Sequence, residues 1–310
     1  MSPARLILSS GDPTVDRRFE WARALMEEGN APDAAALLVE AVERAGHYAP
    51  AWFLLGEARE AAGDPKGAIE AYGRTVALDP ADTLGARLRL ARLGGVSPAE
   101  GGMSEAYVRT LFDQYAARFD AALAHLNYTG PQLIDDALAA ACLTLDRPYV
   151  FGRGLDLGCG TGLVAARLVD RVGEMEGVDL SPNMIALAQQ RGVYERAVAG
   201  EMVAFLTQRP AEDVDLIFAG DAFCYLDDLD PILRQSRRVL EPGGLIAFTL
   251  ETHQRDGVML RDTLRFAHGQ AYARAALEGA GLALVSLTAQ STRREKDEPV
   301  PGLVVVAVKP

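Results

Sequence analysis

The chain has 310 residues, enough for two ordinary domains, and its content of 49% hydrophobic and 24% charged residues excludes a disordered or collagen-like protein. Its formal net charge of −12 argues against nucleic acid or an anionic membrane as a partner, because both repel an acidic chain. The three widely spaced cysteines form no CxxC pair and no disulfide framework. Since we also find neither a membrane-length apolar run nor a signal-peptide pattern, we expect a cytoplasmic protein.

An internal repeat marks the first part of the chain, residues 14–93. When the sequence is shifted by 34 residues, Gly29 falls on Gly63 and Ala34 falls on Ala68. Repeats of this length are typical of stacked helical hairpins, in which small residues let two antiparallel helices touch.

The second copy of this period resembles a tetratricopeptide repeat, because it carries Trp52-x-x-Leu55-Gly56 followed by Gly63-Asp64. The first copy departs from the pattern, since Trp21 and Ala22 stand where Leu-Gly is expected. We predict two such repeats and a capping helix over 83–93, which together form a short all-α solenoid.

A run rich in glycine at 94–102 predicts a boundary, after which one helix is predicted over 104–126 and a second over 131–143. From residue 150 onward, short β-rich runs alternate with helices, which indicates a mainly parallel sheet covered on both faces. The last two strands are joined only by the charged loop 291–301 and should pair as a hairpin. The sequence therefore predicts an α/β fold with a seven-stranded sheet and one antiparallel strand, preceded by the all-α domain. Predicted strands lie near 153–157, 175–180, 195–199, 214–219, 243–250, 281–288 and 302–308.

The most informative stretch is Asp156-Leu157-Gly158-Cys159-Gly160-Thr161-Gly162, between the first strand and a helix. Alternate glycines permit positive φ angles and close approach of a ligand, and the turn is expected to present free N–H groups at a helix start. The run is not the dinucleotide fingerprint, because Leu163 occupies the place of the third glycine. It resembles motif I of the class I S-adenosylmethionine-dependent methyltransferases, D-x-G-x-G-x-G. The resemblance implies that Gly158, Cys159 and Gly160 pass under the methionine part of this cofactor, while Asp156 helps to hold its ammonium group.

Further elements of the same family follow in order along the chain. Asp179 ends the second strand, where a carboxylate can accept hydrogen bonds from both ribose hydroxyls. The resemblance implies that the following segment, with Leu180 and Met184, also binds the cofactor, and that Met184 lies against the adenine. It likewise places Glu201 at the adenine amino group. Two neighbouring residues, Met202 and Ala219 at the end of the fourth strand, complete the predicted cofactor site. Taken alone, Asp179 or Glu201 would be explained equally well by a role at a helix start.

The run Leu111-Phe112-Asp113-Gln114-Tyr115-Ala116-Ala117-Arg118-Phe119-Asp120, followed by Tyr128-x-x-Pro131, is similar to the bacterial tetratricopeptide-repeat methyltransferases. This resemblance implies a repeat domain over 14–93 and a methyltransferase domain over 104–310, made of lid helices at 104–145 and a core at 150–310. It also implies that Tyr115 lies near the sulfonium, since an aromatic face attracts a cation. The alternative is that these aromatic residues belong to the core of an amphipathic helix.

The residues that would act on the acceptor are less clearly marked. The fourth strand lacks the Asn/Asp-Pro-Pro-aromatic run used on amide and adenine nitrogens, which argues against DNA methylation, and scattered cysteines and histidines predict no metal site. His268 is the predicted proton acceptor because histidine titrates near neutral pH. Asp221 is predicted to position the acceptor or the donor ammonium group. The alternative for His268 is a structural role at a helix start or in a loop.

Three classes of function therefore remain open. The first is O- or N-methylation of a small molecule, with repeats that only self-associate or shield the site. The second is methylation of a protein, with repeats that recruit a peptide or a carrier protein. The third is a cofactor-binding regulator without catalysis.

Overall fold

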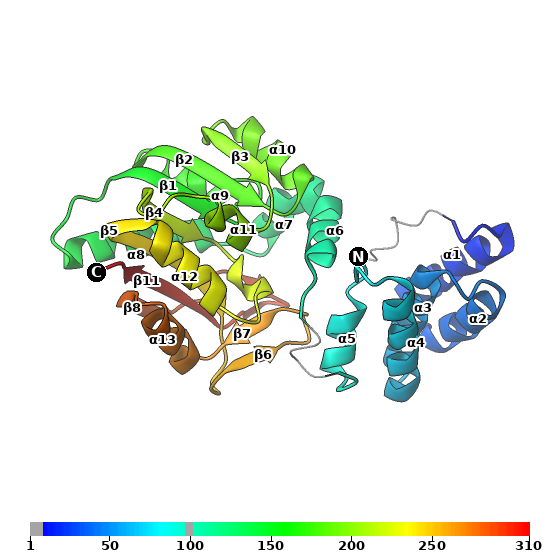
Figure 1. The fold of residues 1–310 in the computed structure, drawn as a ribbon. Coiled ribbons are helices and arrows are strands. Elements are labelled where there is room, and N and C mark those ends of the chain that lie inside the picture. Colours follow the sequence, from blue (N-terminus) through cyan, green and yellow to red (C-terminus); the bar gives the residue numbers. More distant parts are fainter. Residues whose placement is uncertain (1–8, 97–101) are drawn as a thin grey trace. The chain divides into compact units, whose positions relative to one another are not determined.

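A computed structural model describes residues 9–96 and 102–310 of the chain (Figure 1). The chain divides into two compact units, one up to Leu111 and one from Phe112 onward. The predicted boundary at 94–102 falls largely on residues 97–101, which lie outside the described residues. Among the described residues, no helix is long and apolar enough to cross a membrane.

The first unit consists of two helical hairpins and a further short helix. Its helices are α1 (Pro13–Glu27), α2 (Ala31–Arg44), α3 (Ala49–Ala61), α4 (Pro65–Leu78) and α5 (Ala86–Arg92). Helix α4 begins and ends 34 residues after α2, as the repeat predicts. A Cβ atom on Gly56 would lie 2.5 Å from the Tyr72 ring, so only glycine allows α3 to approach α4 this closely. In the first hairpin, Ala22 takes the corresponding place and is fully buried, whereas Trp21 is 56% exposed.

The second unit is built on one sheet whose main path has the order β3-β2-β1-β4-β5-β11-β8. Only β11 runs antiparallel to its two neighbours, β5 and β8, which confirms the predicted sheet of seven strands with one reversed. The strands of this path are β1 (Phe151–Leu157), β2 (Val172–Asp179), β3 (Arg196–Ala199), β4 (Val214–Ala219), β5 (Leu240–Glu251), β8 (Ala283–Ala289) and β11 (Gly302–Val308).

Helices cover both faces of this sheet, as Figure 1 shows. Helices α8 (Gly130–Thr144) and α9 (Leu163–Leu168) enclose one apolar cluster, which contains Phe218. Helices α11 (Met202–Thr207), α12 (Asp230–Val239) and α13 (Gln270–Gly279) enclose the other, which contains Phe248. Helix α10 (Pro182–Arg191) packs beside β2 and β3. Strands β4 and β11 and the second half of β5 are buried almost without interruption, as expected for strands that are covered on both faces.

Two short β-hairpins were not predicted. Strands β6 (Val258–Leu260) and β7 (Phe266–His268) pair with each other, and β7 joins the end of β5 through the pair Glu251↔Ala267. Strands β9 (Arg294–Glu295) and β10 (Glu298–Pro299) form a ribbon within the charged loop. Segments of two or three residues are too short to show a periodic pattern, so the sequence gives no signal for them.

The helix predicted over 104–126 is broken into three pieces. They are α6 (Glu105–Tyr115), the 3₁₀ turn η1 (Ala116–Arg118) and α7 (Phe119–His125). On either side of the break the aromatic rings still meet, because Phe119 lies edge-on against both Phe112 and Tyr115. The apolar spacing predicted the helical segments and their common aromatic face, but not the turn between them.

Candidate active site

The predicted site residues gather where the parallel strands end. The pairs Asp156↔Gly177, Asp156↔Phe218 and Asp179↔Ala199 align the carboxyl ends of β1, β2, β3 and β4. The strand order reverses between β1 and β4, since β2 and β3 extend the sheet on one side and β5 on the other. Such a reversal opens a crevice at the carboxyl ends of the strands, which is where ligands bind in sheets of this kind.

The glycine loop after β1 has the backbone that its sequence requires. Gly158, Gly160 and Gly162 have φ angles of 70°, 53° and 86°, a region that other residues rarely adopt. A Cβ atom on Gly158 would lie 2.5 Å from the Cβ atom of Ala222, so the loop also packs too tightly there for any side chain. The loop therefore offers a smooth glycine surface.

Three N–H groups in the first part of this loop are engaged within the protein, whereas the free N–H groups predicted at the following helix start stay a prediction. The N–H groups of Gly158 and Cys159 both donate to the carbonyl oxygen of Val178, over 2.8 and 2.9 Å. The N–H of Gly160 donates to Oδ2 of Asp179 over 2.9 Å. Residues 158–160 are thus held against β2 by these hydrogen bonds.

Asp179 links the glycine loop to the start of α10. Besides the bond from Gly160, its Oδ1 atom accepts the N–H of Ser181 over 2.9 Å. Burial raises the pKa of Asp179, while the two backbone hydrogen bonds act in the opposite direction. The helix cap itself is Ser181, whose Oγ accepts the N–H of Met184, so capping does not explain Asp179. Each carboxylate oxygen keeps a lone pair for a further donor.

Asp156 is 1% exposed and accepts a hydrogen bond of 2.7 Å from the Tyr194 hydroxyl. Burial raises its pKa to about 7; the Tyr194 hydrogen bond lowers it and the charge of Asp179 raises it further. Tyr194 was not predicted as a site residue, although its ring also lies 2.9 Å from the Cβ position of Gly162. A lone tyrosine before β3 carries no sequence signal for such a contact.

The remaining predicted cofactor residues surround this centre. Glu201 caps α11, where its carboxylate accepts the N–H groups of Val203 and Ala204 over 2.9 and 2.7 Å, so the helix-start role holds for this residue. The Met202 sulfur lies 3.7 Å from the Cβ position of Gly158. Met184 and Ala219 are fully buried, and Leu180, the residue directly after β2, is partly exposed.

Four aromatic rings form a cluster, one of which contacts the glycine loop. Phe112 contacts Phe119 and Tyr225 with centroid distances of 6.1 and 5.3 Å, and Tyr115 contacts Phe119 at 5.9 Å. The Phe119 ring lies 3.6 Å from the Cβ position of Gly160. Phe119, rather than the predicted Tyr115, is thus the ring that the structure shows against the loop.

Asp221, the predicted positioning residue, is held by hydrogen bonds on both carboxylate oxygens. Its Oδ1 accepts the Thr249 hydroxyl, and its Oδ2 accepts the Thr292 hydroxyl and the guanidinium of Arg293, each over 2.8 Å. Arg293 is only 4% exposed and also pairs with the buried Glu251. A buried guanidinium needs such partners to offset its desolvation. In the sequence Arg293 belongs to the charged loop 291–301, and nothing in its local context marks it as part of a site.

A partly exposed arginine extends this network. Arg265 donates to the Tyr225 hydroxyl over 3.2 Å and to the Glu295 carboxylate over 2.8 Å. Burial raises the pKa of Tyr225 to about 12, although the neighbouring guanidinium lowers it. Tyr225 therefore stays protonated at neutral pH.

His268 lies apart from Asp221, and the two side chains share no hydrogen bond in the described structure. The His268 ring is fully buried, stacks on Tyr272 at 5.7 Å and has its Nε2 atom 3.0 Å from the carbonyl oxygen of Leu226. Its Nδ1 atom has no partner among the described residues. Burial lowers the pKa of His268 to about 4, so the ring is neutral at pH 7.

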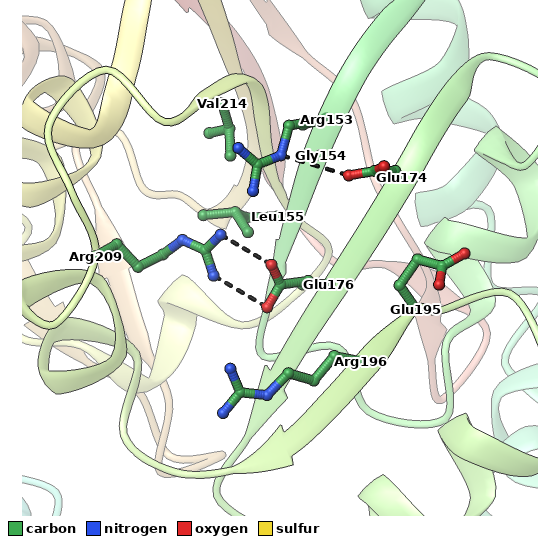
Figure 2. A pocket seen from close by; sticks show the side chains of 9 residues that line it. All are labelled: Arg153, Gly154, Leu155, Glu174, Glu176, Glu195, Arg196, Arg209 and Val214. Atoms are coloured by element: carbon green, nitrogen blue, oxygen red, sulfur yellow. Dashed lines mark hydrogen bonds and ion pairs between the residues drawn. The ribbon is translucent and has the colours of Figure 1, made fainter.

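A cavity of about 160 Å³ lies toward the opposite ends of the strands, and Figure 2 shows the residues that line it. Most of the charged side chains that line it are paired. Arg209 donates two hydrogen bonds to the Glu176 carboxylate over 2.9 and 3.0 Å, and Nε of Arg153 lies 3.6 Å from a carboxylate oxygen of Glu174. None of the predicted site residues lines this cavity. In the described part of the chain, no three His, Cys, Asp or Glu side chains gather as metal ligands would.

Comparison with known families agrees with both units. Residues 25–93 match the family model for a tetratricopeptide repeat, and residues 155–248 match that for a methyltransferase domain. The chain carries tetratricopeptide repeats followed by a class I methyltransferase domain. Two solved structures share the fold of this domain. A Leishmania major S-adenosylmethionine-dependent methyltransferase aligns with a TM-score of 0.53 at 14% identity. A Haloferax volcanii protein solved in complex with a methyltransferase activator aligns with a TM-score of 0.50 at 20% identity. The alignments cover 66% and 64% of this chain and 82% and 97% of those chains.

Curated relatives match the methyltransferase domain over shorter stretches. Human methyltransferase-like protein 27 is 34% identical over 152 residues, which is 46% of this chain and 57% of that protein. The malonyl-[acyl-carrier protein] O-methyltransferase of Salmonella typhimurium is 33% identical over 111 residues, 36% of this chain and 43% of that enzyme. The chain thus spans about half the length of these relatives, so the match identifies the domain and leaves its substrate open.

Proposed function

We propose that the methyltransferase domain transfers a methyl group from S-adenosylmethionine to an acceptor. The observation that carries this proposal is Asp179 at the carboxyl end of β2, which is bonded to the glycine loop and to Ser181 and yet keeps a lone pair on each oxygen. The loop's glycine surface and the buried Asp156 beside it suit the methionine end of that cofactor.

The bound cofactor would supply an electrophilic methyl group on a sulfonium. In this proposal Asp179 accepts the ribose hydroxyls, Asp156 holds the ammonium group, and Gly158, Cys159 and Gly160 support the methionine part. The remaining contacts are assigned to Tyr115, Leu180, Met184, Glu201, Met202 and Ala219. Transfer is an in-line displacement, so alignment and exclusion of water by these side chains supply much of the rate.

Two residues are proposed to act on the acceptor. Asp221 is a positioning group, since Thr249, Thr292 and Arg293 already bind its oxygens and fix its orientation. His268 is the proposed proton acceptor where the substrate must lose a proton, through the Nδ1 atom that has no partner among the described residues. Because the ring is fully buried, this role requires the loop at Leu226 to open before the acceptor reaches it.

The proposed acceptor is a small molecule methylated on oxygen or nitrogen. The alternative, a protein or carrier-protein acceptor recruited by the repeats, is favoured by one specific observation: a relative at 33% identity is named for a substrate on an acyl-carrier protein. A weaker alternative is a regulator that binds the cofactor without catalysis. The proposed location is the cytoplasm, which suits three free, buried cysteines.

One experiment separates these functions. A cell lysate is treated with the purified protein and donor carrying a tritiated methyl group, and is then split into protein and small-molecule fractions. Label in small molecules supports the first function, and label in protein supports the alternative. Calorimetry with S-adenosylhomocysteine accompanies it: binding without label supports the regulator, and absence of binding contradicts the proposed cofactor.

A further inference from the structure

The Phe-Asp pair occurs twice in the segment before the sheet, as Phe112-Asp113 in α6 and as Phe119-Asp120 at the start of α7. The phenylalanine rings of the two pairs meet edge-on, with Phe119 against Gly160. The two aspartates reach outward from this segment to different parts of the sheet domain, and their contacts are specific.

Asp113 fastens the segment to the first turn of α10. Its Oδ1 atom accepts the Ser181 hydroxyl over 2.5 Å and the N–H of Asn183 over 3.2 Å, and its carbonyl oxygen accepts the Asn183 amide over 3.0 Å. Ser181 is also the residue whose N–H donates to Asp179. The first fastening is therefore one hydrogen bond away from the proposed ribose acceptor.

Asp120 fastens the segment to the end of the glycine loop. Its Oδ1 atom accepts the Thr161 hydroxyl over 2.6 Å, and its Oδ2 atom accepts the Arg191 guanidinium over 2.7 Å. Arg191 donates in turn to the carbonyl oxygen of Thr161 over 2.6 Å. The side chains of Asp120 and Arg191 are 49% and 27% exposed, so water can replace this fastening when it opens.

We propose that Asp113 and Asp120 are positioning residues that clasp residues 112–120 across the glycine loop, and that opening of this clasp sets how long a nucleoside ligand stays bound. This inference rests on the proposed function, because it concerns the same cofactor site. Between the two fastenings lies Phe119, the ring that covers Gly160, so a closed clasp both shields the loop from water and blocks the way out. Both fastenings carry a full charge on the acceptor, which makes their hydrogen bonds stronger than neutral ones.

The test compares four full-length proteins: the wild type, Asp113→Ala, Asp120→Ala and the control Asp136→Ala. Asp136 is an exposed carboxylate on α8 with one hydrogen bond, from Gln132, and it lies outside the clasp. Radiolabelled S-adenosylhomocysteine is bound and then chased with an excess of unlabelled ligand. Each clasp variant is expected to release the ligand about tenfold faster than the wild type, since one opened charge-assisted hydrogen bond accounts for such a factor, whereas the control does not change.

Hydrogen exchange of residues 112–120 in the ligand-free proteins gives a second readout. It should accelerate in both clasp variants and not in the control, with melting temperatures close to that of the wild type. If an alanine variant does not fold, Asp→Asn at the same position replaces it. Wild-type release rates in folded clasp variants overturn the proposal. If the wild type binds no S-adenosylhomocysteine, the proposed function is contradicted. In that case the hydrogen-exchange rates alone test the clasp, and rates for residues 112–120 that do not change in the variants overturn it.

Discussion

Replacing Asp179 with asparagine tests the ribose assignment most directly. The side chain keeps its size, but it loses its charge and one of its two acceptor atoms. In the native protein both oxygens are engaged, each with a backbone N–H at 2.9 Å, from Gly160 and Ser181. The asparagine oxygen can accept only one of these, and its NH₂ group faces the other donor.

The expected loss follows from these contacts. A hydrogen bond to a charged group contributes about 1.5–3 kcal/mol, and the ribose hydroxyls would lose their charged acceptor in the variant. We therefore expect the affinity for S-adenosylhomocysteine to fall by about 2–3 kcal/mol, which is roughly 30- to 150-fold in Kd. The fold should survive, because the strand pairing around Asp179 is made by the backbone.

Calorimetry with S-adenosylhomocysteine and its 2′-deoxy analogue separates this effect from general damage to the site. The wild type should bind the analogue about tenfold more weakly, since one hydroxyl is missing. The Asp179→Asn variant should bind the two ligands with equal affinity, while Asp136→Asn should behave as the wild type. Unchanged affinity in the Asp179 variant, or retained discrimination between the two ligands, would refute the assignment of the ribose to this carboxylate.

Three further outcomes are expected. Burial raises the pKa of Asp156 to about 7, so calorimetry should show the affinity for the cationic ammonium group rising between pH 6 and 8 in the wild type and staying flat in Asp156→Asn. Because the folded chain retains a proton on Asp156 that the unfolded chain has lost, the stability of the fold should also decrease as pH rises from about 4 to about 7. With a known acceptor, His268→Ala should lower turnover about 10²-fold or more at neutral pH with donor affinity kept, whereas a merely structural histidine would change only the melting temperature. A chain without residues 1–93 should bind S-adenosylhomocysteine with wild-type affinity; complete loss in the folded, truncated protein would contradict the predicted division into domains.

The sequence could bring the residues of the proposed donor site together because local segments build it. Most of the predicted positions stand at the end of a strand or shortly after it, so the chain order alone places them at the common edge of the sheet. The glycines of the loop have positive φ angles, which is a property that residue type reveals. Asp179 could be singled out for the same reason, since an acid at a strand end is visible in one stretch of sequence.

The contacts that escaped prediction join segments far apart in the chain. Tyr194 reaches Asp156 from the loop before β3, and Arg293 reaches Asp221 from the loop before β11. Such pairs depend on the register of the folded sheet, which no local pattern contains. The burial of His268 escaped for a related reason, because β7 is only three residues long and joins the sheet at a single pair.

The proposed acceptor half of the site differs from the proposed donor half in its physical character. Its carboxylates, Asp221 and Glu251, are both bound by the buried guanidinium of Arg293, so their charges are balanced within the protein. Removing that arginine would leave two carboxylates without a common counter-charge, which is the costly case for buried ions. The network thus fixes the end of β4 against β5 and the charged loop, and holds Asp221 in one orientation. For a displacement whose rate depends on alignment, a rigid and charge-balanced wall opposite the donor is what the chemistry requires, whichever acceptor enters.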